Sequence, residues 1–322
     1  MPKQEFPQDK MLTQQSFQSQ EDEIDLRELA SAIWQGKWVI ICITAIFAVS
    51  SVFYTLSIPD EYKATALLAP ASTSNGSSLS KLASQYGGLA TLAGLSLGGS
   101  DGNDKVVIGV EILKAWSFLE EFILDNNLQV EVFATRGWNK ATNSLIIDPE
   151  VYNVEKKQWI RDFDPSIGES AEPSSWELYE KIKDRITIIQ DEETGLIHLS
   201  VEFYSPLIAK VWVDRLVKAI NQDMQLKDRD EAVKSIKYLK QKIEETAVAD
   251  MQAVFYQLIE EQTKTLMLAE VNDEYVFKTI SEARIAEEKS KPRRALIVVI
   301  ATFFGGLFSL IVVLIRLNFN RG

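Results

Sequence analysis

Residues 207–291 read LIAKVWVDRLVKAINQDMQLKDRDEAVKSIKYLKQKIEETAVADMQAVFYQLIEEQTKTLMLAEVNDEYVFKTISEARIAEEKSK, 85 residues without a glycine or a proline. These two residue types fit a helix interior least well, so their absence predicts a mainly helical stretch. Ser205 and Pro206 precede it and suit the first turn of a helix, where a side-chain acceptor is useful and a proline N–H is not missed. One straight helix of this length would measure about 128 Å, more than a compact domain spans. We therefore expect the stretch to turn back or to project.

The apolar residues of this stretch divide it into two parts. Residues 225–231 contain only one apolar residue, Leu226, so the helix is expected to leave the domain body there. After residue 231 apolar residues return at spacings of three and four, which predicts packing on another helix, either a returning segment or a neighbouring subunit. Before residue 225 an apolar residue recurs every fourth position and is predicted to cover a sheet: Ile208, Trp212, Leu216, Ile220 and Met224.

Strand patterns precede the helical stretch. Residues 62–70 alternate in polarity and end at a proline, and residues 185–190 and 196–204 flank a polar turn, which predicts a hairpin. Residues 108–124 show helical spacing. The fold class is therefore an α+β domain with a long projecting helix at about residues 206–265. The predicted buried positions are Ile197, Leu199, Val201 and Phe203 in the hairpin, and Ile112, Trp116, Leu119 and Ile123 in the earlier helix.

Two uncharged segments of 21 residues each, 38–58 and 295–315, lie near the chain ends. Each is long enough as a helix to cross a hydrocarbon core of about 30 Å. A cleaved signal peptide is the alternative for the first, but the 37 residues before it are acidic rather than short and basic. We expect two transmembrane helices that separate an N-terminal segment (1–37), a middle domain (59–294) and a tail (316–322). Short helices are also expected at residues 25–34 and 79–93.

The charge balance excludes one class of partner and leaves the orientation open. A net charge of −12 argues against nucleic acid, because binding to phosphates needs clustered cations. Lysine and arginine lie on both sides of the two apolar segments, so the positive-inside rule gives no decision. The single cysteine, Cys42, rules out a disulfide within the chain.

No catalytic pattern stands in a fitting context. Residues 94–98 match GxSxG around Ser96, but the motif lies in a glycine-rich loop rather than between a strand and a helix. His198 is the only histidine and falls on the polar face of a strand. The sequence has no phosphate-binding loop of the GxxxxGK[ST] type and no Cys/His cluster, so we expect no enzyme activity, no cofactor and no metal. Three tryptophans suit either stacking on sugar rings or packing in a core or interface: Trp138, Trp159 and Trp176.

The second apolar segment carries small residues on one face. Ala301, Gly305 and Ser309 lie at i, i+4 and i+8, with Gly306 beside them, a pattern that lets another helix approach closely. Thr44 and Ala48 have the same spacing in the first segment. These six positions are the candidates for transmembrane helix packing. The candidates for the point where the chain enters the second span are Pro292, Arg293 and Arg294.

Taken together, two spans at the chain ends, a large helix-rich middle and a proline before the second span resemble the bacterial O-antigen chain-length determinants, the polysaccharide co-polymerases. The resemblance covers nearly the whole chain. It is carried by residues 24–29 (IDLREL), 62–64 (YKA), 67–70 (LLAP), 87–90 (GGLA), 261–263 (EQT), 266–269 (LMLA) and 290–297 (SKPRRALI).

The resemblance implies an inner-membrane protein with both termini cytoplasmic and the middle domain periplasmic. It also implies a homo-oligomeric ring or bell that controls how far the O-antigen polymerase extends a lipid-linked glycan, with no active site. A regulator of capsule or exopolysaccharide polymerisation and export is the alternative within the superfamily, and such proteins usually pair with a tyrosine kinase. A membrane-anchored periplasmic sensor is a third reading, for which 37 and 7 residues outside the spans leave little room for an output domain.

Overall fold

The computed structural model describes residues 34, 36–71, 101–168 and 170–321. It consists of two compact units, one formed by residues 57–293 and one formed by the segments on either side of it. The helices predicted at 25–34 and 79–93, and Ser96, lie outside the described residues, apart from Trp34 at the end of the first.

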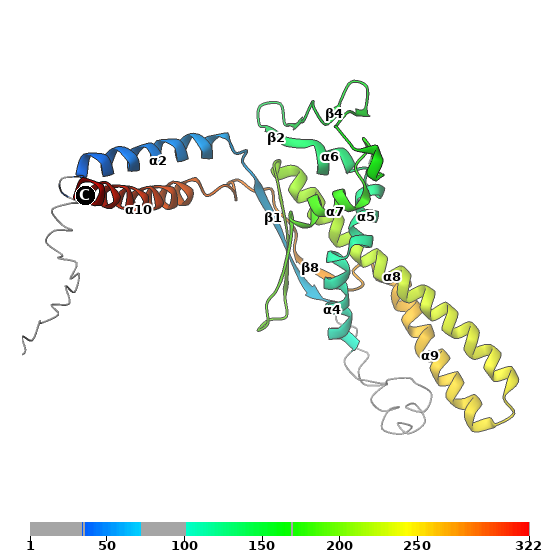
Figure 1. Ribbon diagram of the computed structural model, residues 1–322. Helices are drawn as coiled ribbons and strands as arrows, with labels where there is room; N and C mark the ends of the chain where they lie inside the picture. Colours follow the sequence, from blue (N-terminus) through cyan, green and yellow to red (C-terminus); the bar gives the residue numbers. More distant parts are fainter. Residues whose placement is uncertain (1–33, 35, 72–100, 169, 322) are drawn as a thin grey trace, which may run out of the picture. The chain divides into compact units, whose positions relative to one another are not determined.

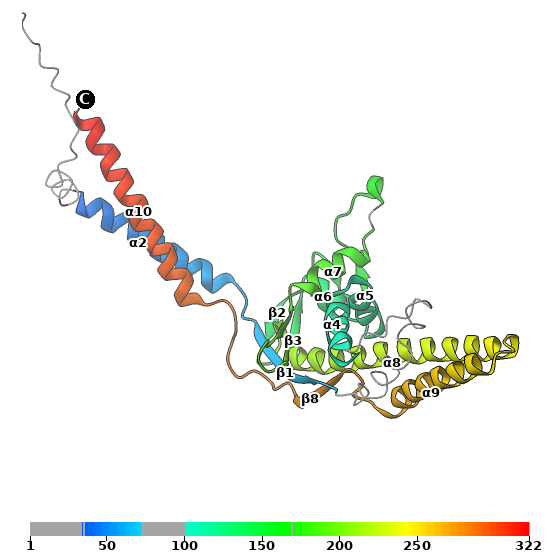
Figure 2. The same cartoon turned by 90° about the horizontal axis from the view of Figure 1, so that it is seen from below.

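The outer unit contains two apolar helices, α2 (Lys37–Ser57) and α10 (Arg294–Arg321), which lie side by side in Figures 1 and 2. Both are long and apolar enough to cross a membrane. Only 11% and 17% of their most apolar windows are buried, so neither resembles the core helix of a soluble domain. The two apolar segments predicted from the sequence are therefore confirmed as helices, and α10 continues beyond the predicted end.

The middle unit is built on an antiparallel sheet in the order β6-β7-β1-β8. Its strands are β1 (Tyr62–Pro70), β6 (Ile186–Gln190), β7 (Ile197–Phe203) and β8 (Phe277–Ser281). The predicted strand and hairpin are confirmed, and the four predicted apolar residues of β7 are fully buried. β8 was not predicted, so the expectation that residues 207–291 are mainly helical is wrong for the part after residue 271.

The long helical stretch forms a hairpin of α8 (Pro206–Glu245) and α9 (Ala249–Val271), visible in both views. Thr246 and Val248 have extended backbones between the two helices. Gln252 stabilises this turn, since its side-chain amide donates to the carbonyl oxygens of Thr246 over 2.7 Å and Ile243 over 3.3 Å. The sequence left two partners open for the distal part of α8, a returning segment or a neighbouring subunit. In the structure a returning segment, α9, packs on it.

The first half of α8 covers the sheet through β1 and β7. The fourfold apolar repeat predicted to do so is confirmed, because Trp212, Leu216 and Ile220 are almost completely buried. The indole of Trp212 packs on the ring of Phe203 from β7 with a centroid separation of 4.6 Å. This contact joins the helix to the centre of the sheet.

Four shorter helices gather beside the first half of α8 in Figure 1. They are α4 (Asp101–Lys114), α5 (Trp116–Asp125), α6 (Gln129–Ala134) and α7 (Ser175–Lys183). The sequence predicted one helix over residues 108–124, but Ala115 has an extended backbone and separates α4 from α5. This break changes the helical phase, so Trp116 is exposed, contrary to its predicted place on the buried face, whereas Leu119 and Ile123 are buried as predicted.

Two small hairpins lie between α6 and α7: β2 (Thr135–Asn139) with β3 (Ser144–Ile147), and β4 (Tyr152–Asn153) with β5 (Gln158–Trp159). They lead to a 3-10 turn at Pro165–Ile167. Arg161 ties this region to α7, because its guanidinium binds the Glu177 carboxylate through both nitrogens and donates to two backbone carbonyls. The Arg161 hydrogen bond lowers the pKa of Glu177 to about 2, although partial burial acts in the opposite direction.

Candidate functional site

A buried asparagine on α8 fixes the start of β8. The Oδ1 atom of Asn221 accepts from the backbone N–H groups of Val276 over 2.8 Å and Phe277 over 2.9 Å, and its Nδ2 donates to the carbonyl of Phe277 over 2.9 Å. Asn221 is 3% exposed. All three interactions are therefore shielded from water, and a buried group that loses its partner is costly. Asn221 holds the edge strand that leads toward the second span.

A second polar cluster joins three segments at the base of the helical hairpin. Lys105 of α4 lies 2.6 Å from the Asp228 carboxylate of α8, and the Tyr275 hydroxyl donates to the same carboxylate oxygen over 2.7 Å. Burial, together with this hydrogen bond, raises the pKa of Tyr275 to about 12. Burial alone would lower the pKa of Lys105, but the contact with Asp228 outweighs it and the pKa is raised. Lys105 and Asp228 therefore stay charged as a salt bridge, and the raised pKa of Lys105 does not suit it to act as a general base.

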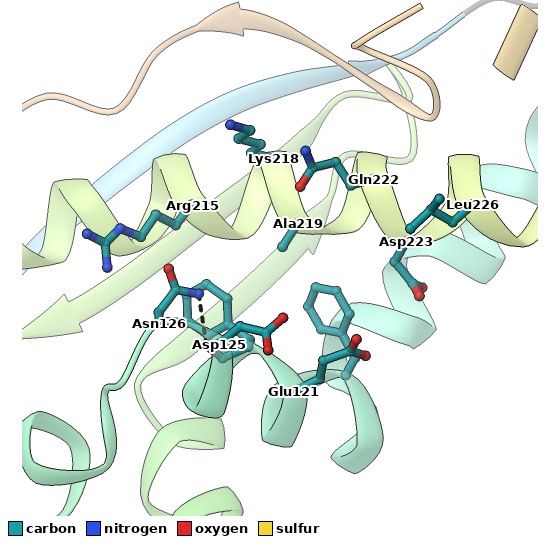
Figure 3. A pocket seen from close by; sticks show the side chains of 11 residues that line it. Glu121, Asp125, Asn126, Arg215, Lys218, Ala219, Gln222, Asp223 and Leu226 are labelled. Carbon is teal, nitrogen blue, oxygen red and sulfur yellow. Dashed lines mark hydrogen bonds between the residues drawn. The ribbon is translucent and has the colours of Figure 1, made fainter. Parts of the chain in front are cut away.

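A surface groove of about 620 Å³ lies between α5 and α8. Figure 3 shows Glu121 and Asp125 of α5, with the following Asn126, on one side of this groove and the side chains of α8 on the other. Among the described residues, the lining consists of Phe118, Glu121, Phe122, Asp125, Asn126, Arg215, Lys218, Ala219, Gln222, Asp223 and Leu226.

The groove combines both signs of charge with two amides above buried phenylalanines. Asp223 is paired with Lys227 over 2.7 Å. Arg215 lies near Glu131, whose pKa is raised by burial although a hydrogen bond from Trp212 and the Arg215 charge act in the opposite direction. Donors and acceptors of this kind suit a polyhydroxylated or peptide ligand. In the part of the chain that the structure describes, no serine, cysteine or histidine lines the groove to serve as a nucleophile or base.

The two ends of the middle unit are joined beside the start of β1. The backbone N–H of Glu61 donates to the carbonyl of Lys291 over 2.9 Å, and that of Ser290 donates to the carbonyl of Glu61 over 2.8 Å. The Glu202 carboxylate of β7 forms an ion pair with the Lys291 ammonium and accepts a hydrogen bond from the Ser290 hydroxyl. Burial alone would raise the pKa of Glu202, but these two partners lower it. The hydrogen bond between residues 61 and 291 therefore joins the two ends of the middle unit.

The two apolar helices meet closely at a glycine. A Cβ atom added to Gly305 would lie 2.6 Å from the Cβ of Phe47, well inside van der Waals contact. A Cβ on Gly306 would have only Thr44 Oγ1 near it, at 4.0 Å. Ser309, one turn further along α10, is fully buried, and its hydroxyl donates to the carbonyl of Gly306 over 2.6 Å. Close approach of α2 therefore depends on the missing side chain of Gly305.

The remaining candidate positions from the sequence are less tightly packed. Ala48 and Ala301 are half-buried, as is Thr44. Pro292 and Arg293 precede α10 and Arg294 is its first residue. Sequence reasoning missed Phe47 and the buried Ser51 and Thr55 on α2. The spacing of small residues from Ala48 to Ser51 and Thr55 would have indicated this face.

Of the other sequence candidates that the structure describes, none lines the groove between α5 and α8. His198 is exposed on β7, where it pairs with Leu67 and Ile189 in the sheet register. Trp138 packs edge-on against Tyr62, and Trp159 does so against Tyr152, whereas Trp176 is 52% exposed. Within the described residues no group of three or more histidine, cysteine, aspartate or glutamate side chains is placed to hold a metal ion.

Two family models match different parts of the chain. Residues 22–125 match the model described as chain length determinant protein, and residues 245–318 match the model described as G-rich domain on putative tyrosine kinase. The first match contains α2, β1, α4 and α5, and the second contains α9, β8 and most of α10. No curated protein matches the chain.

Two solved structures that match the chain are distant in sequence. A full-length bacterial polysaccharide co-polymerase is 12% identical, with 92% of this chain and 99% of that chain covered and a TM-score of 0.37. A fragment of WzzB, a polysaccharide co-polymerase from Salmonella Typhimurium, is also 12% identical, with 72% and 100% covered and a TM-score of 0.27.

Proposed function

Since the chain belongs to the polysaccharide co-polymerases, the family of chain-length determinants, we propose that it sets the modal length of the O-antigen of lipopolysaccharide. The observation that carries this proposal is the match of residues 22–125 to the chain length determinant model. That match spans the first apolar helix, α2, and the first strand of the sheet, β1. The protein acts on the length of a polymer that another protein, the O-antigen polymerase, synthesises.

The mechanism is oligomeric scaffolding. Copies of the chain assemble into a ring or bell that holds the polymerase or the growing lipid-linked glycan until a preferred length is reached. The 40-residue helix α8, which with α9 extends beyond the sheet, supports this role because it gives each subunit a long rigid surface. A catalytic step is not part of the proposal, and neither a cofactor nor a metal is needed.

The proposed location is the bacterial inner membrane, with residues 38–58 and 295–315 as the spans. Residues 59–294 lie in the periplasm, and residues 1–37 and 316–322 lie in the cytoplasm. Labelling of single cysteines introduced at Lys240 and Ser281, with Cys42 replaced by serine, tests this topology. A membrane-impermeant maleimide added to intact spheroplasts is expected to modify both positions. Modification only after the inner membrane is opened would contradict the proposed orientation.

Packing of the spans is proposed to contribute to assembly. Gly305, Gly306, Ser309 and Ala301 of α10, with Thr44 and Ala48 of α2, form the face through which the spans pack. The close approach at Gly305 supports this assignment. Pro292, Arg293 and Arg294 are proposed to set the point at which the chain enters the second span, with the two arginines near the headgroups.

Deletion of the gene, followed by electrophoresis of lipopolysaccharide, tests the proposed function. The wild-type strain is expected to show a cluster of bands at a preferred length, and the deletion strain a distribution that decays steadily from short chains. Reintroduction of the gene restores the cluster. An unchanged band pattern in the deletion strain, with the protein confirmed as absent, would contradict the proposal.

The match to the G-rich domain of putative tyrosine kinases favours a second candidate function, regulation of capsule or exopolysaccharide polymerisation and export. The chain has no GxxxxGK[ST] loop of its own, so a kinase would be a separate partner. The same deletion strain separates the two functions. Loss of capsular or secreted polysaccharide, or a change in its mass by size-exclusion chromatography, with an unchanged lipopolysaccharide pattern would support the second candidate.

A further inference from the structure

Three aromatic rings gather on the surface where the start of α5 lies beside α7. The ring centroids of Trp116 and Trp176 are 5.3 Å apart, and Tyr179 lies 5.7 Å from Trp176 and 6.3 Å from Trp116. Trp116 is 45% exposed and Trp176 is 52% exposed, whereas Tyr179 is half-buried. We call these three residues the aromatic platform.

Hydrogen bonds hold the platform in one arrangement. The indole N–H of Trp116 donates to the hydroxyl of Ser175 over 2.7 Å, and the hydroxyl of Tyr179 donates to the backbone carbonyl of Lys114 over 3.3 Å. The first bond joins α5 to α7, and the second joins α7 to the end of α4. The rings are therefore ordered before any ligand arrives, which lowers the entropy that binding would lose.

The core of the domain does not require the exposed rings. Leu178 and Ile182 are the residues of α7 that are buried against the rest of the domain. A capping box between Ser174 and Glu177 already fixes the first turn of α7, with the Ser174 hydroxyl accepting from the backbone N–H of Glu177. Trp176 therefore lies on the outward side of a helix that is anchored without it.

The platform is small and has a charged border. A tryptophan offers about 150–250 Å² of surface, so two half-exposed rings present about 200 Å², well below the roughly 800 Å² that each partner contributes to a stable protein interface. Ion pairs lie beside it, Lys114 with Glu111 over 2.9 Å and Lys183 with Glu180 over 2.5 Å. An apolar surface of this area, with donors and acceptors at its border, fits one or two sugar rings better than a protein.

We propose that the aromatic platform of Trp116, Trp176 and Tyr179 binds pyranose rings of the polysaccharide whose length this protein regulates. The C–H groups on one face of a pyranose pack on the electron-rich faces of the indoles. The sugar hydroxyls at the ring edge exchange hydrogen bonds with the bordering lysines and glutamates. This inference rests on the proposed function for the identity of its ligand, but the stacking chemistry is general to pyranosides.

Binding is measured on the full-length protein in detergent micelles with two probes. One is a fragment of two to five repeat units released by mild acid from the strain's own lipopolysaccharide, and the other is a fragment of its capsular or secreted polysaccharide. Saturation-transfer difference NMR reports which sugar protons contact the protein, and tryptophan fluorescence gives the affinity. We expect saturable binding of at least one probe and at least a tenfold weaker affinity for the Trp176→Ala variant.

The control is Leu124→Ala, which removes a side chain of similar exposure, 49%, from the same helix as Trp116. This variant is expected to bind with wild-type affinity. Trp176→Phe retains a smaller ring and is expected to give an intermediate loss, which guards against a misfolded alanine variant. Circular dichroism checks that all three variants keep the wild-type helix content.

Each outcome has a defined meaning for the platform. Failure of both probes to bind the wild-type protein, or equal affinities in wild-type and Trp176→Ala proteins, would overturn the proposal. A change of oligomer mass in Trp176→Ala with unchanged glycan binding would assign the surface to a protein contact and would also overturn it. The proposed function fails separately, through an unchanged lipopolysaccharide pattern in the deletion strain, so the two failures are distinguishable.

Discussion

Replacement of Asn221 by leucine is expected to release β8 from α8. The substitution keeps a side chain of similar size but removes all three hydrogen bonds to Val276 and Phe277. Two backbone N–H groups and one carbonyl then remain buried without the asparagine. The matched control is Gln222→Leu at the next position, where the native side chain is exposed.

The magnitude follows from the number of groups left without a partner. A buried donor or acceptor that loses its partner costs about 1–3 kcal/mol, so three of them predict a loss of about 3–5 kcal/mol in the free energy of unfolding once partial relaxation is allowed. For a unit of the size of residues 57–293, each kcal/mol lowers the midpoint by about 2–4 °C, which predicts a decrease of about 10 °C. Gln222→Leu is expected to change the stability by less than about 0.5 kcal/mol.

The assay is thermal unfolding of the full-length protein in detergent, followed by circular dichroism and by tryptophan fluorescence, to which the buried Trp212 contributes. Hydrogen exchange with mass spectrometry then locates the effect. The peptide that contains residues 275–281 is expected to lose protection in Asn221→Leu before the rest of the sheet does. If both variants unfold at the wild-type temperature and this peptide stays protected, the assignment of Asn221 as the residue that holds β8 is wrong.

Three further predictions concern the spans and two titrating groups. Gly305→Ala is expected to force α2 and α10 apart, because its Cβ would meet Phe47, and to broaden the length distribution of the polysaccharide. Gly306→Ala is expected to leave the helix packing and the length distribution unchanged. Lipopolysaccharide electrophoresis checks this prediction, and equal behaviour of the two variants would contradict it. Glu177 has a pKa lowered to about 2, so its stabilising effect is present above about pH 4.5 and is lost as the pH falls toward 2. The stability of Glu177→Gln, measured by acid unfolding, should therefore fall less over this pH range than that of the wild type. Identical pH dependence in both proteins would refute the prediction. Tyr275 has a pKa raised to about 12, so its contribution to the free energy of unfolding is present below about pH 10 and is lost as the pH rises toward 12. Tyr275→Phe should lower the free energy of unfolding by about 1 kcal/mol at neutral pH, and the variant should lose less stability in alkali than the wild type, as measured by urea unfolding.

The parts of the fold that follow from local periodicity could be predicted from the sequence. Alternation of polarity gave β1 and the β6–β7 hairpin, and the fourfold repeat from Ile208 to Met224 gave the buried face of α8. The two uncharged segments gave α2 and α10. In each case one simple period describes which side of the element faces the core.

The parts that depend on interruptions of a period were missed. The turn between α8 and α9 contains no glycine or proline and is formed by extended Thr246 and Val248, capped from outside by Gln252. β8 is only five residues long and owes its position to Asn221, which is distant in sequence. The extended backbone of Ala115 exposed Trp116 and produced the aromatic platform.

The small-residue spacing in the second span pointed to Gly305, but not to its contact. Phe47 is a large residue, and nothing in the sequence of α2 identifies it as the side chain that packs over a glycine of α10. The groove between α5 and α8 likewise combines residues about 90 positions apart, which periodicity within one helix cannot bring together.

The most direct test of the central claim places this chain in a bacterium that makes a different O-antigen and lacks its own chain-length determinant. If the chain itself sets the length, the lipopolysaccharide of that host acquires a preferred number of repeat units when the protein is expressed. A distribution that still decays steadily from short chains, with the protein present in the inner membrane at native abundance, would contradict the account.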